Sequence, residues 1–279
     1  MRSSGIEWPG GSTRNSAAAC AQEASEPGTC VPGGLPILPE SVAVLQSLRR
    51  ASPIDLNEIV RAVRQDPGLL ANILRILARL TGQRTNLYEA IIDIGVEGLR
   101  RLGSFMCCEP TQMNHVRAIA RNSVFVAAAC EQVALECGFL DSELAHSAGL
   151  LHDIGKLRFI SACEVANTEL WTSIEKQVYG AIGGELARVW GFPDELTEAI
   201  GLHANEHARK GHVLPTLVAL AVRSNDCCAP GCATELDVET HALVRECALL
   251  TGVTPDRILE LIRVAHSNWC LQTGTEVQV

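Results

Sequence analysis

The residues best suited to chemistry are His152 and Asp153, which stand side by side in the run AGLLHDIGKL at 148–157. Imidazole nitrogen and carboxylate oxygen are ligands that divalent metal ions take in hydrolytic enzymes. The surrounding run is apolar, and a histidine and an aspartate are costly to bury unless something binds them. The pair therefore indicates either a metal site or a buried pair in which the carboxylate orients the imidazole by a hydrogen bond.

The position of this pair depends on the element that carries it. We expect a helix that begins at 141–143, runs through His152 and Asp153, and is stopped by Gly155. Lys156 follows at once. Its ammonium group suits contact with a phosphate, and an equally good alternative is a solvated lysine beyond the helix end.

The overall composition limits the partners that the chain can take. Its 279 residues carry a formal net charge of −9. Phosphate backbones bind basic surfaces, so we expect no nucleic-acid partner. No run reaches the roughly 18 apolar residues that cross a bilayer, and the N-terminus lacks the apolar core of a signal peptide. We therefore expect a soluble, cytoplasmic protein without a membrane partner.

Twelve cysteines are many for a chain of this length. They lie in apolar helical runs or as adjacent pairs, whereas disulfide-rich secreted domains are usually much smaller. We therefore expect reduced thiols. The cluster of Cys227, Cys228 and Cys232 is compatible with a metal or redox site, but no second pair at zinc-finger spacing accompanies it. The alternative is a set of small apolar residues around a Pro-Gly turn.

The pattern of apolar residues predicts an all-α protein. Only 4% of the residues are aromatic while 47% are hydrophobic, so the core must be built from Leu, Ile, Val and Ala. We find no alternating strand and no internal repeat. Besides the helix of the His–Asp pair and one that begins near 164, apolar spacing predicts helices over 40–50, 56–65, 67–80, 87–93, 96–106, 115–137, 172–190, 194–203, 214–228, 236–250 and 254–268.

Several short motifs occur along the chain in a fixed order. They are LPILP at 35–39, DPGLL at 66–70, the dipeptides at 90–91 and 95–96, AGLLHDIGKL at 148–157, the segment 183–193 that ends in WGFP, and EAIGLH at 198–203. In this order the chain resembles the HDOD domain family, signalling relatives of the HD phosphohydrolases and of the HD-GYP cyclic-dinucleotide phosphodiesterases. The resemblance covers about 34–230, with one departure at 78–82, where ARLTG replaces the family's asparagine-serine motif.

The resemblance implies a multi-helical HD-like bundle with an N-terminal helical lobe. We expect a disordered leader over 1–33, the N-terminal lobe over 34–110, the HD-like lobe over 111–270 and a flexible tail over 271–279. The two lobes would join near 107–113. Trp190, in the WGFP motif, is expected in the core.

The resemblance also implies metal ligands on several helices, and the sequence retains some of them. His152, Asp153 and His203 match family ligands. The family's last aspartate falls on Val222 in an ungapped register, and a shift of one turn would recruit Asp226 instead. Three or four such ligands suffice for one weakly bound divalent ion such as Fe, Mn or Zn.

Three other family ligand positions carry different residues. Asn122, Tyr179 and Ala204 stand where the family has histidine, so the binuclear centre that cyclic-dinucleotide hydrolysis needs is broken. The Gly-Tyr-Pro element of those phosphodiesterases is also absent. We therefore expect a degenerate metal site, with no cofactor required.

Two clusters of polar residues near these positions are predicted to face solvent. His203, Glu206 and His207 could share a metal on one helical face, but the basic run that follows favours a solvated helix end. His146 and Glu143 are expected to form a surface pair.

Two functions follow from the resemblance. The first is a non-catalytic regulatory HDOD protein in bacterial signal transduction, which acts through a protein partner or a small ligand such as a nucleotide. The alternative is a metal-dependent phosphohydrolase on a nucleotide or cyclic nucleotide, with His152, Asp153, His203 and Asp226 as the ligands. A degenerate pocket between the helices would suit the small ligand.

Overall fold

The structure is a computed structural model that describes residues 34–48, 55–80, 87–105, 112–162, 176–227 and 237–273. Every regular element in these ranges is a helix, which confirms the all-α prediction. None of the described helices is long and apolar enough to cross a membrane. The predicted leader at 1–33, the predicted helix start near 164 and residues Cys228 and Cys232 lie outside the described ranges.

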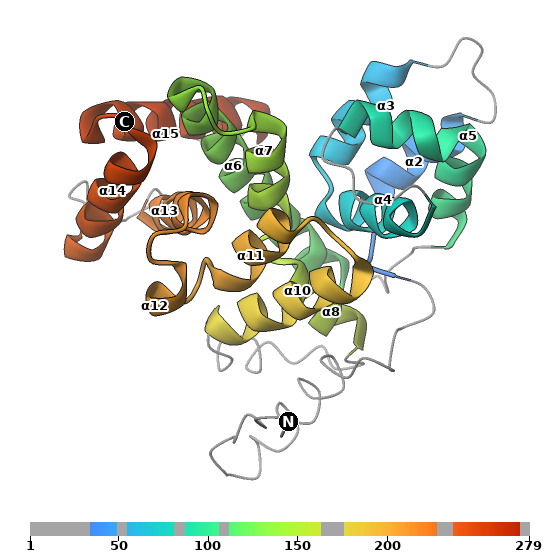
Figure 1. Ribbon diagram of the computed structural model, residues 1–279. Helices are drawn as coiled ribbons and strands as arrows, with labels where there is room; N and C mark the ends of the chain where they lie inside the picture. The colour runs from blue at the N-terminus through green and yellow to red at the C-terminus, as the bar shows by residue number, and fades with distance from the viewer. Residues whose placement is uncertain are drawn as a thin grey trace, which may run out of the picture.

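The described part of the first lobe contains four helices (Figure 1): α2 (Pro39–Ser47), α3 (Leu56–Arg64), α4 (Pro67–Leu80) and α5 (Leu87–Phe105). Asp55 caps α3, since its carboxylate accepts a hydrogen bond from the backbone N–H of Asn57 at 2.9 Å. Gly95 interrupts α5 with φ 65° and ψ 170°, which explains why the sequence predicts two short helices there. The sequence therefore locates the break at Gly95 correctly.

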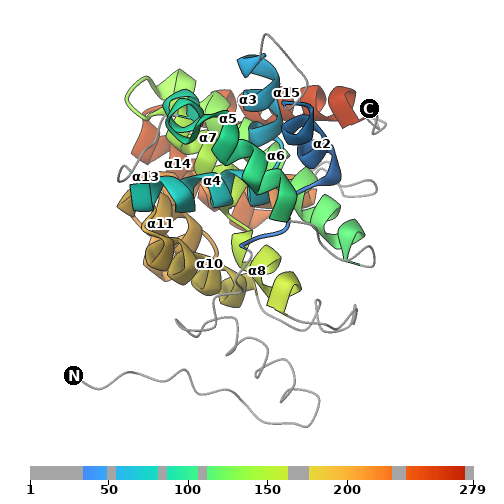
Figure 2. The ribbon, with the colours of Figure 1, turned by 90° about the vertical axis from the view of Figure 1, so that its right-hand side faces the viewer.

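The second lobe is larger and surrounds the long helix α6 (Met113–Cys137). It continues with α7 (Ser142–Leu151), α8 (Ile154–Ala162), α10 (Lys176–Trp190), α11 (Asp194–Leu202), α12 (Glu206–Arg209), α13 (Val213–Cys227), α14 (Val238–Thr251) and α15 (Pro255–Thr273). Helices α7, α13 and α15 all pack against α6. In Figure 2 the first lobe faces the viewer, in front of α6 and α7. Because α15 continues to Thr273, its last turn occupies the start of the predicted tail.

The two lobes share one hydrophobic core. Leu69 of the first lobe and Phe125 and Leu217 of the second are fully buried and belong to the same continuous cluster. Trp190 is buried as predicted, and the guanidinium of Arg75 on α4 lies 4.9 Å from its ring centroid. The position of α4 therefore fixes the first lobe against the helices of the candidate site.

The segment before α2 is attached to α4 by polar contacts. The Asp66 carboxylate accepts from the backbone N–H of Leu38 at 2.8 Å and from that of Leu69 at 3.0 Å, so it caps α4 and holds the entry segment together. The Asn72 amide donates to the Leu35 carbonyl at 2.9 Å and accepts from its N–H at 3.2 Å. A Cβ on Gly68 would lie 1.8 Å from the carbonyl oxygen of Pro36. The DPG run therefore combines a cap, a helix start and a close backbone approach.

Gly68→Ala is expected to destabilise the protein by about 1 to 3 kcal/mol, because the added methyl group displaces the Pro36 backbone. Gly201→Ala is the matched control, since its Cβ would meet Gly184 at an ordinary 3.5 Å. The control should be neutral or gain up to about 1 kcal/mol from helix propensity. Urea denaturation of both variants measures the difference. Equal stability of the two variants would contradict the close approach.

Asp66 should make the stability depend on pH. Burial raises the pKa of its carboxyl from 3.8 to about 6, although hydrogen bonds from the Leu69 and Leu38 N–H groups oppose the shift. The folded state therefore binds more protons between these values, and the contribution of Asp66 to stability, complete below pH 4, is lost as pH rises through 6. Asp66→Asn should consequently destabilise less at pH 7 than at pH 4, by about 2 kcal/mol. Denaturation of wild type and variant at both pH values tests this, and an equal penalty at the two would refute it.

Candidate functional site

His152 and Asp153 lie at a break between two helices. Helix α7 ends at Leu151 and α8 begins at Ile154, so the pair forms the turn between them. The prediction of one helix stopped by Gly155 is wrong, because Gly155 lies within the first turn of α8. It is a glycine for another reason: a Cβ there would meet the carbonyl oxygen of Tyr179 on α10 at 2.1 Å.

Further glycines allow the helices around the site to approach closely. A Cβ on Gly149 of α7 would lie 2.6 Å from the Cα of Ala127 on α6. A Cβ on Gly184 of α10 would lie 2.7 Å from the Cα of Gly201 on α11. These distances are shorter than any real Cβ contact, so each glycine lets two backbones meet. As a result, α6, α7, α8, α10 and α11 converge on one point.

The two histidines meet at this point. His152 is 1% exposed and His203 is 6% exposed, and their ring centroids lie 5.3 Å apart in an edge-to-face arrangement. Nδ1 of His152 lies 2.7 Å from the Gly149 carbonyl oxygen, and Nδ1 of His203 lies 2.9 Å from that of Ile200. Because a carbonyl only accepts, each Nδ1 carries a proton. Metal-binding histidines are oriented in the same way.

Asp153 is a buried carboxylate with three polar neighbours. Its Oδ2 accepts from Nζ of Lys156 at 2.6 Å and from the amide of Asn122 at 3.5 Å, and it lies 3.3 Å from Nε2 of His152. Burial alone would raise the pKa of Asp153, but His152 and Lys156 outweigh it and hold that pKa well below its ordinary value. The carboxylate is therefore ionised at neutral pH.

His203 is held in its neutral form. Burial and the neighbouring His152 lower the pKa of His203 to about 4, although Asp153 and the Ile200 carbonyl oppose the shift. The prediction of a solvated helix end is thus wrong for His203, whose side chain is buried, and right for Glu206 and His207, which are exposed. The site consequently offers a neutral imidazole beside an ionised carboxylate.

Two positions that the resemblance assigns to family ligands, Tyr179 and Ala204, lie near this point. Tyr179 is 3% exposed, and its ring contacts Phe159 with centroids 6.0 Å apart and lies 5.8 Å from Nζ of Lys156. The adjacent Gly180 faces both Ala204 and His203, because a Cβ built on it would lie 3.6 and 3.7 Å from their side chains. Tyr179 thus lies beside Lys156, and Ala204 lies with His203 around Gly180.

The sequence did not identify Asn225, which belongs to the site. Its amide donates a hydrogen bond to Oδ1 of Asn122, so two asparagines connect α13 to Asp153. Val222, one candidate for the last family ligand, packs against the core instead. The side chain of Asp226, the other candidate, lies outside the described structure. A helical-face argument from Val222 would have included Asn225, which lies three residues further on.

A second polar cluster joins the two lobes. Arg64 of α3 donates to Glu131 at 2.6 Å and to Glu143 at 2.8 Å, and its guanidinium lies 3.0 Å from Nδ1 of His146. His146 is only 6% exposed. The predicted surface pair of His146 and Glu143 is therefore wrong, because the docked first lobe covers the imidazole.

The described donor set does not fit an HD-type metal centre. Among the described residues, no group of three or more His, Cys, Asp or Glu side chains has the geometry to hold a metal ion. The Asp153 carboxylate, which a metal would need, is already held by the Lys156 ammonium and the Asn122 amide. Nε2 of His152 is buried 3.3 Å from Oδ2 of Asp153, so it is the nitrogen that a cation bound to this carboxylate would contact. Metal binding here stays a prediction.

The model of the HDOD domain matches residues 35–206. The chain belongs to the HDOD domain family. It shares its fold with the MmoQ response regulator of Methylococcus capsulatus str. Bath, at a TM-score of 0.59 and 18% identity over 84% of this chain and 99% of that one. A putative metal-dependent phosphohydrolase of Shewanella amazonensis SB2B gives a TM-score of 0.50 and 18% identity over 92% and 98% of the two chains.

Curated relatives of this HDOD protein include Ribonuclease Y of Lawsonia intracellularis, which is 31% identical over 241 residues. That match covers 82% of this chain and 38% of the relative. Ribonuclease Y of Desulfotalea psychrophila is 31% identical over 137 residues, 48% of this chain and 23% of the relative. The chain thus spans well under half the length of these relatives.

Lys156→Met is expected to destabilise the protein by about 3 kcal/mol, because it leaves the buried Asp153 carboxylate without its cation. The double variant with Asp153→Asn should lose less than the sum of the two single variants. Lys210→Met, at an exposed lysine, is the matched control and should change stability by less than about 0.5 kcal/mol. Chemical denaturation of the wild type, the two single variants and the double variant measures this double-mutant cycle. Strict additivity would show that the ion pair contributes nothing.

Proposed function

We propose that this HDOD protein is a regulatory module of bacterial signal transduction, in which the HD site is structural and Lys156 supplies the positive charge that a metal supplies in HD hydrolases. The observation that carries the proposal is the 2.6 Å contact between Nζ of Lys156 and the carboxylate of Asp153. An ammonium group neutralises a carboxylate, but it cannot activate a water molecule as a Lewis acid does.

The residues around the ion pair of Lys156 and Asp153 support a structural role for this site. Asn122 and Asn225 occupy the remaining polar space with amide groups that bind each other and Asp153. Tyr179 fills a family ligand position with a ring that packs on Phe159. Such a site gives the bundle a fixed geometry, and function then depends on what the protein binds. A signalling role also agrees with the fold shared with MmoQ, a response regulator.

The second candidate is phosphodiester hydrolysis. It is favoured by the two histidines, whose Nδ1 atoms are both held by carbonyl groups while their Nε2 atoms remain available. The curated relatives are named Ribonuclease Y, so RNA joins nucleotides and cyclic nucleotides as a substrate class for this alternative. The donor set described above argues against it, because it leaves too few ligands for the metal that the reaction needs.

Metal content separates the two candidates. Protein purified from medium with added Fe, Mn and Zn is expected to hold well below one ion per chain by elemental analysis. With Mn²⁺ it should cleave a cyclic dinucleotide and an RNA oligonucleotide no faster than Asp153→Asn does. Stoichiometric metal that is lost in His152→Ala, together with cleavage, would reject the regulatory proposal in favour of the hydrolase.

Removal of Lys156 tests whether its ammonium group takes the place of a metal ion. Lys156→Ala leaves Asp153, His152 and His203 around a space without a cation, so Mn²⁺ or Zn²⁺ should raise the melting temperature of this variant. The same ions should leave wild type unchanged, and Lys156→Ala combined with Asp153→Asn should lose the response. If wild type responds as strongly as the variant, Lys156 does not take the place of a metal.

A further inference from the structure

Helix α4 attaches the first lobe to the second. Among the described helices, the extensive contacts between the lobes are those of α4 with α7, α8 and α10. A Cβ on Gly191, which follows α10, would lie 3.3 Å from the Cβ of Ala78, and Arg75 lies over the ring of Trp190. Leu69 of α4 is fully buried in the core that the lobes share. The first lobe is therefore fixed most firmly at this helix.

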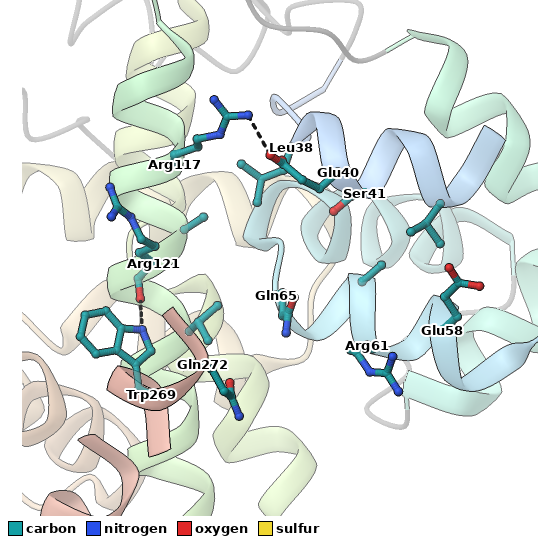
Figure 3. A pocket seen from close by; sticks show the side chains of 14 residues that line it. Leu38, Glu40, Ser41, Glu58, Arg61, Gln65, Arg117, Arg121, Trp269 and Gln272 are labelled. Atoms are coloured by element: carbon teal, nitrogen blue, oxygen red, sulfur yellow. Dashed lines mark hydrogen bonds and ion pairs between the residues drawn. The ribbon is translucent and has the colours of Figure 1, made fainter. Parts of the chain in front are cut away.

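Helices α2 and α3 face the second lobe across a cleft of about 450 Å³. Figure 3 shows these two helices on one side of the cleft and α6 and α15 on the other. Leu38, Val44 and Ala62 line it from the first lobe, and Ala120 and Val124 line it from the second. Apolar side chains of the two lobes thus border a space here instead of packing together. This edge of the first lobe is held less firmly than α4.

Two polar bridges join the lobes beside the cleft. Arg117 of α6 donates to Glu40 of α2 at 2.8 Å, and both side chains are exposed (Figure 3). Arg64 of α3 donates to the two oxygens of Glu131 on α6 at 2.7 and 2.6 Å, and to Glu143 of α7 at 2.8 Å. The bridges lie about 20 Å apart along α6. The Arg64 bridge is the stronger of the two, because it joins two carboxylates and is partly buried.

The Arg64 bridge covers a buried histidine. His146 of α7 is 6% exposed, and its Nδ1 lies 3.0 Å from the Arg64 guanidinium and 3.2 Å from Oε2 of Glu131. The imidazole is therefore protected only while α3 is seated against α6 and α7. Its accessibility to a reagent reports the position of the first lobe at this end of the cleft.

We propose that the two bridges form a strap that holds the cleft closed, and that the first lobe turns about α4 when the strap opens. Salt screens ion pairs between partly exposed groups, whereas the burial of apolar surface along α4 does not depend on charge. The open form exposes His146 and the surfaces of α3 and α6 that line the cleft. The lobes thus present a different combined surface in each form, as hinge closure does in other regulatory proteins.

Modification of histidines by diethyl pyrocarbonate at pH 7, followed by mass spectrometry, tests the strap. The exposed His241 is the internal reference, and His152, which is 1% exposed, should stay protected throughout. Relative to His241, His146 of wild type should react about threefold faster in 1 M NaCl than at low salt. Glu131→Gln, which preserves the shape of the side chain, should raise the rate at His146 about fivefold at low salt.

Arg117→Met separates a turn of the whole lobe from local exposure of the imidazole. Arg117 lies about 20 Å along α6 from Glu131, the residue of α6 that contacts His146. If the lobe turns as a unit, loss of the Arg117 bridge should still raise the rate at His146 about twofold. Arg61→Met, at an exposed arginine one turn before Arg64 on α3, is the matched control and should react as wild type does.

Three results would overturn the proposal. They are a rate at His146 that 1 M NaCl leaves unchanged in wild type, a rate that Arg117→Met leaves unchanged, and a rate at His152 that rises in step with that at His146. The last result would show global unfolding in place of a turn about α4. The salt experiment uses wild type alone, so the test holds even where a variant folds poorly. Metal content and cleavage at the HD site do not enter these measurements, so the strap and the proposed function can fail separately.

Discussion

A carboxylate buried in a helical core must be neutralised locally, and the centre of this protein is built around that requirement. Asp153 is 5% exposed and ionised, so it needs a cation and hydrogen-bond donors within reach. Lys156 lies three residues further on in α8 and places its ammonium group 2.6 Å away. The break between α7 and α8 makes this geometry possible, since it turns the His152–Asp153 pair toward the start of α8.

The same centre requires unusually close contact between helices. Gly149, Gly155 and Gly184 each lie where a side chain would meet the backbone of another helix. These contacts bring His152 and His203 into one buried space and put Tyr179 and Ala204 beside them.

The first lobe adds a surface that the second lobe alone does not have. Its helix α3 supplies Arg64 to a polar cluster with Glu131 and Glu143, and it supplies Arg61 to the inter-lobe cleft. Docking of this lobe buries His146 and leaves an arginine-lined space between α3, α6 and α15. Two separate places, the HD site and the cleft, thus depend on how the lobes pack.

The sequence by itself determined the helical class, the break at Gly95 between the helices predicted over 87–93 and 96–106, and the family, because each depends on local spacing or on a short motif. It also named His152, Asp153, His203, Asn122, Tyr179, Ala204 and Lys156, which the structure gathers in one region. Only the tertiary structure decided that Gly155 serves a helix contact, that His146 and His203 are buried, and that Asn225 belongs to the site. The inter-lobe cleft likewise has no local signal, because the helices that line it are far apart in the chain and come together only when the lobes dock.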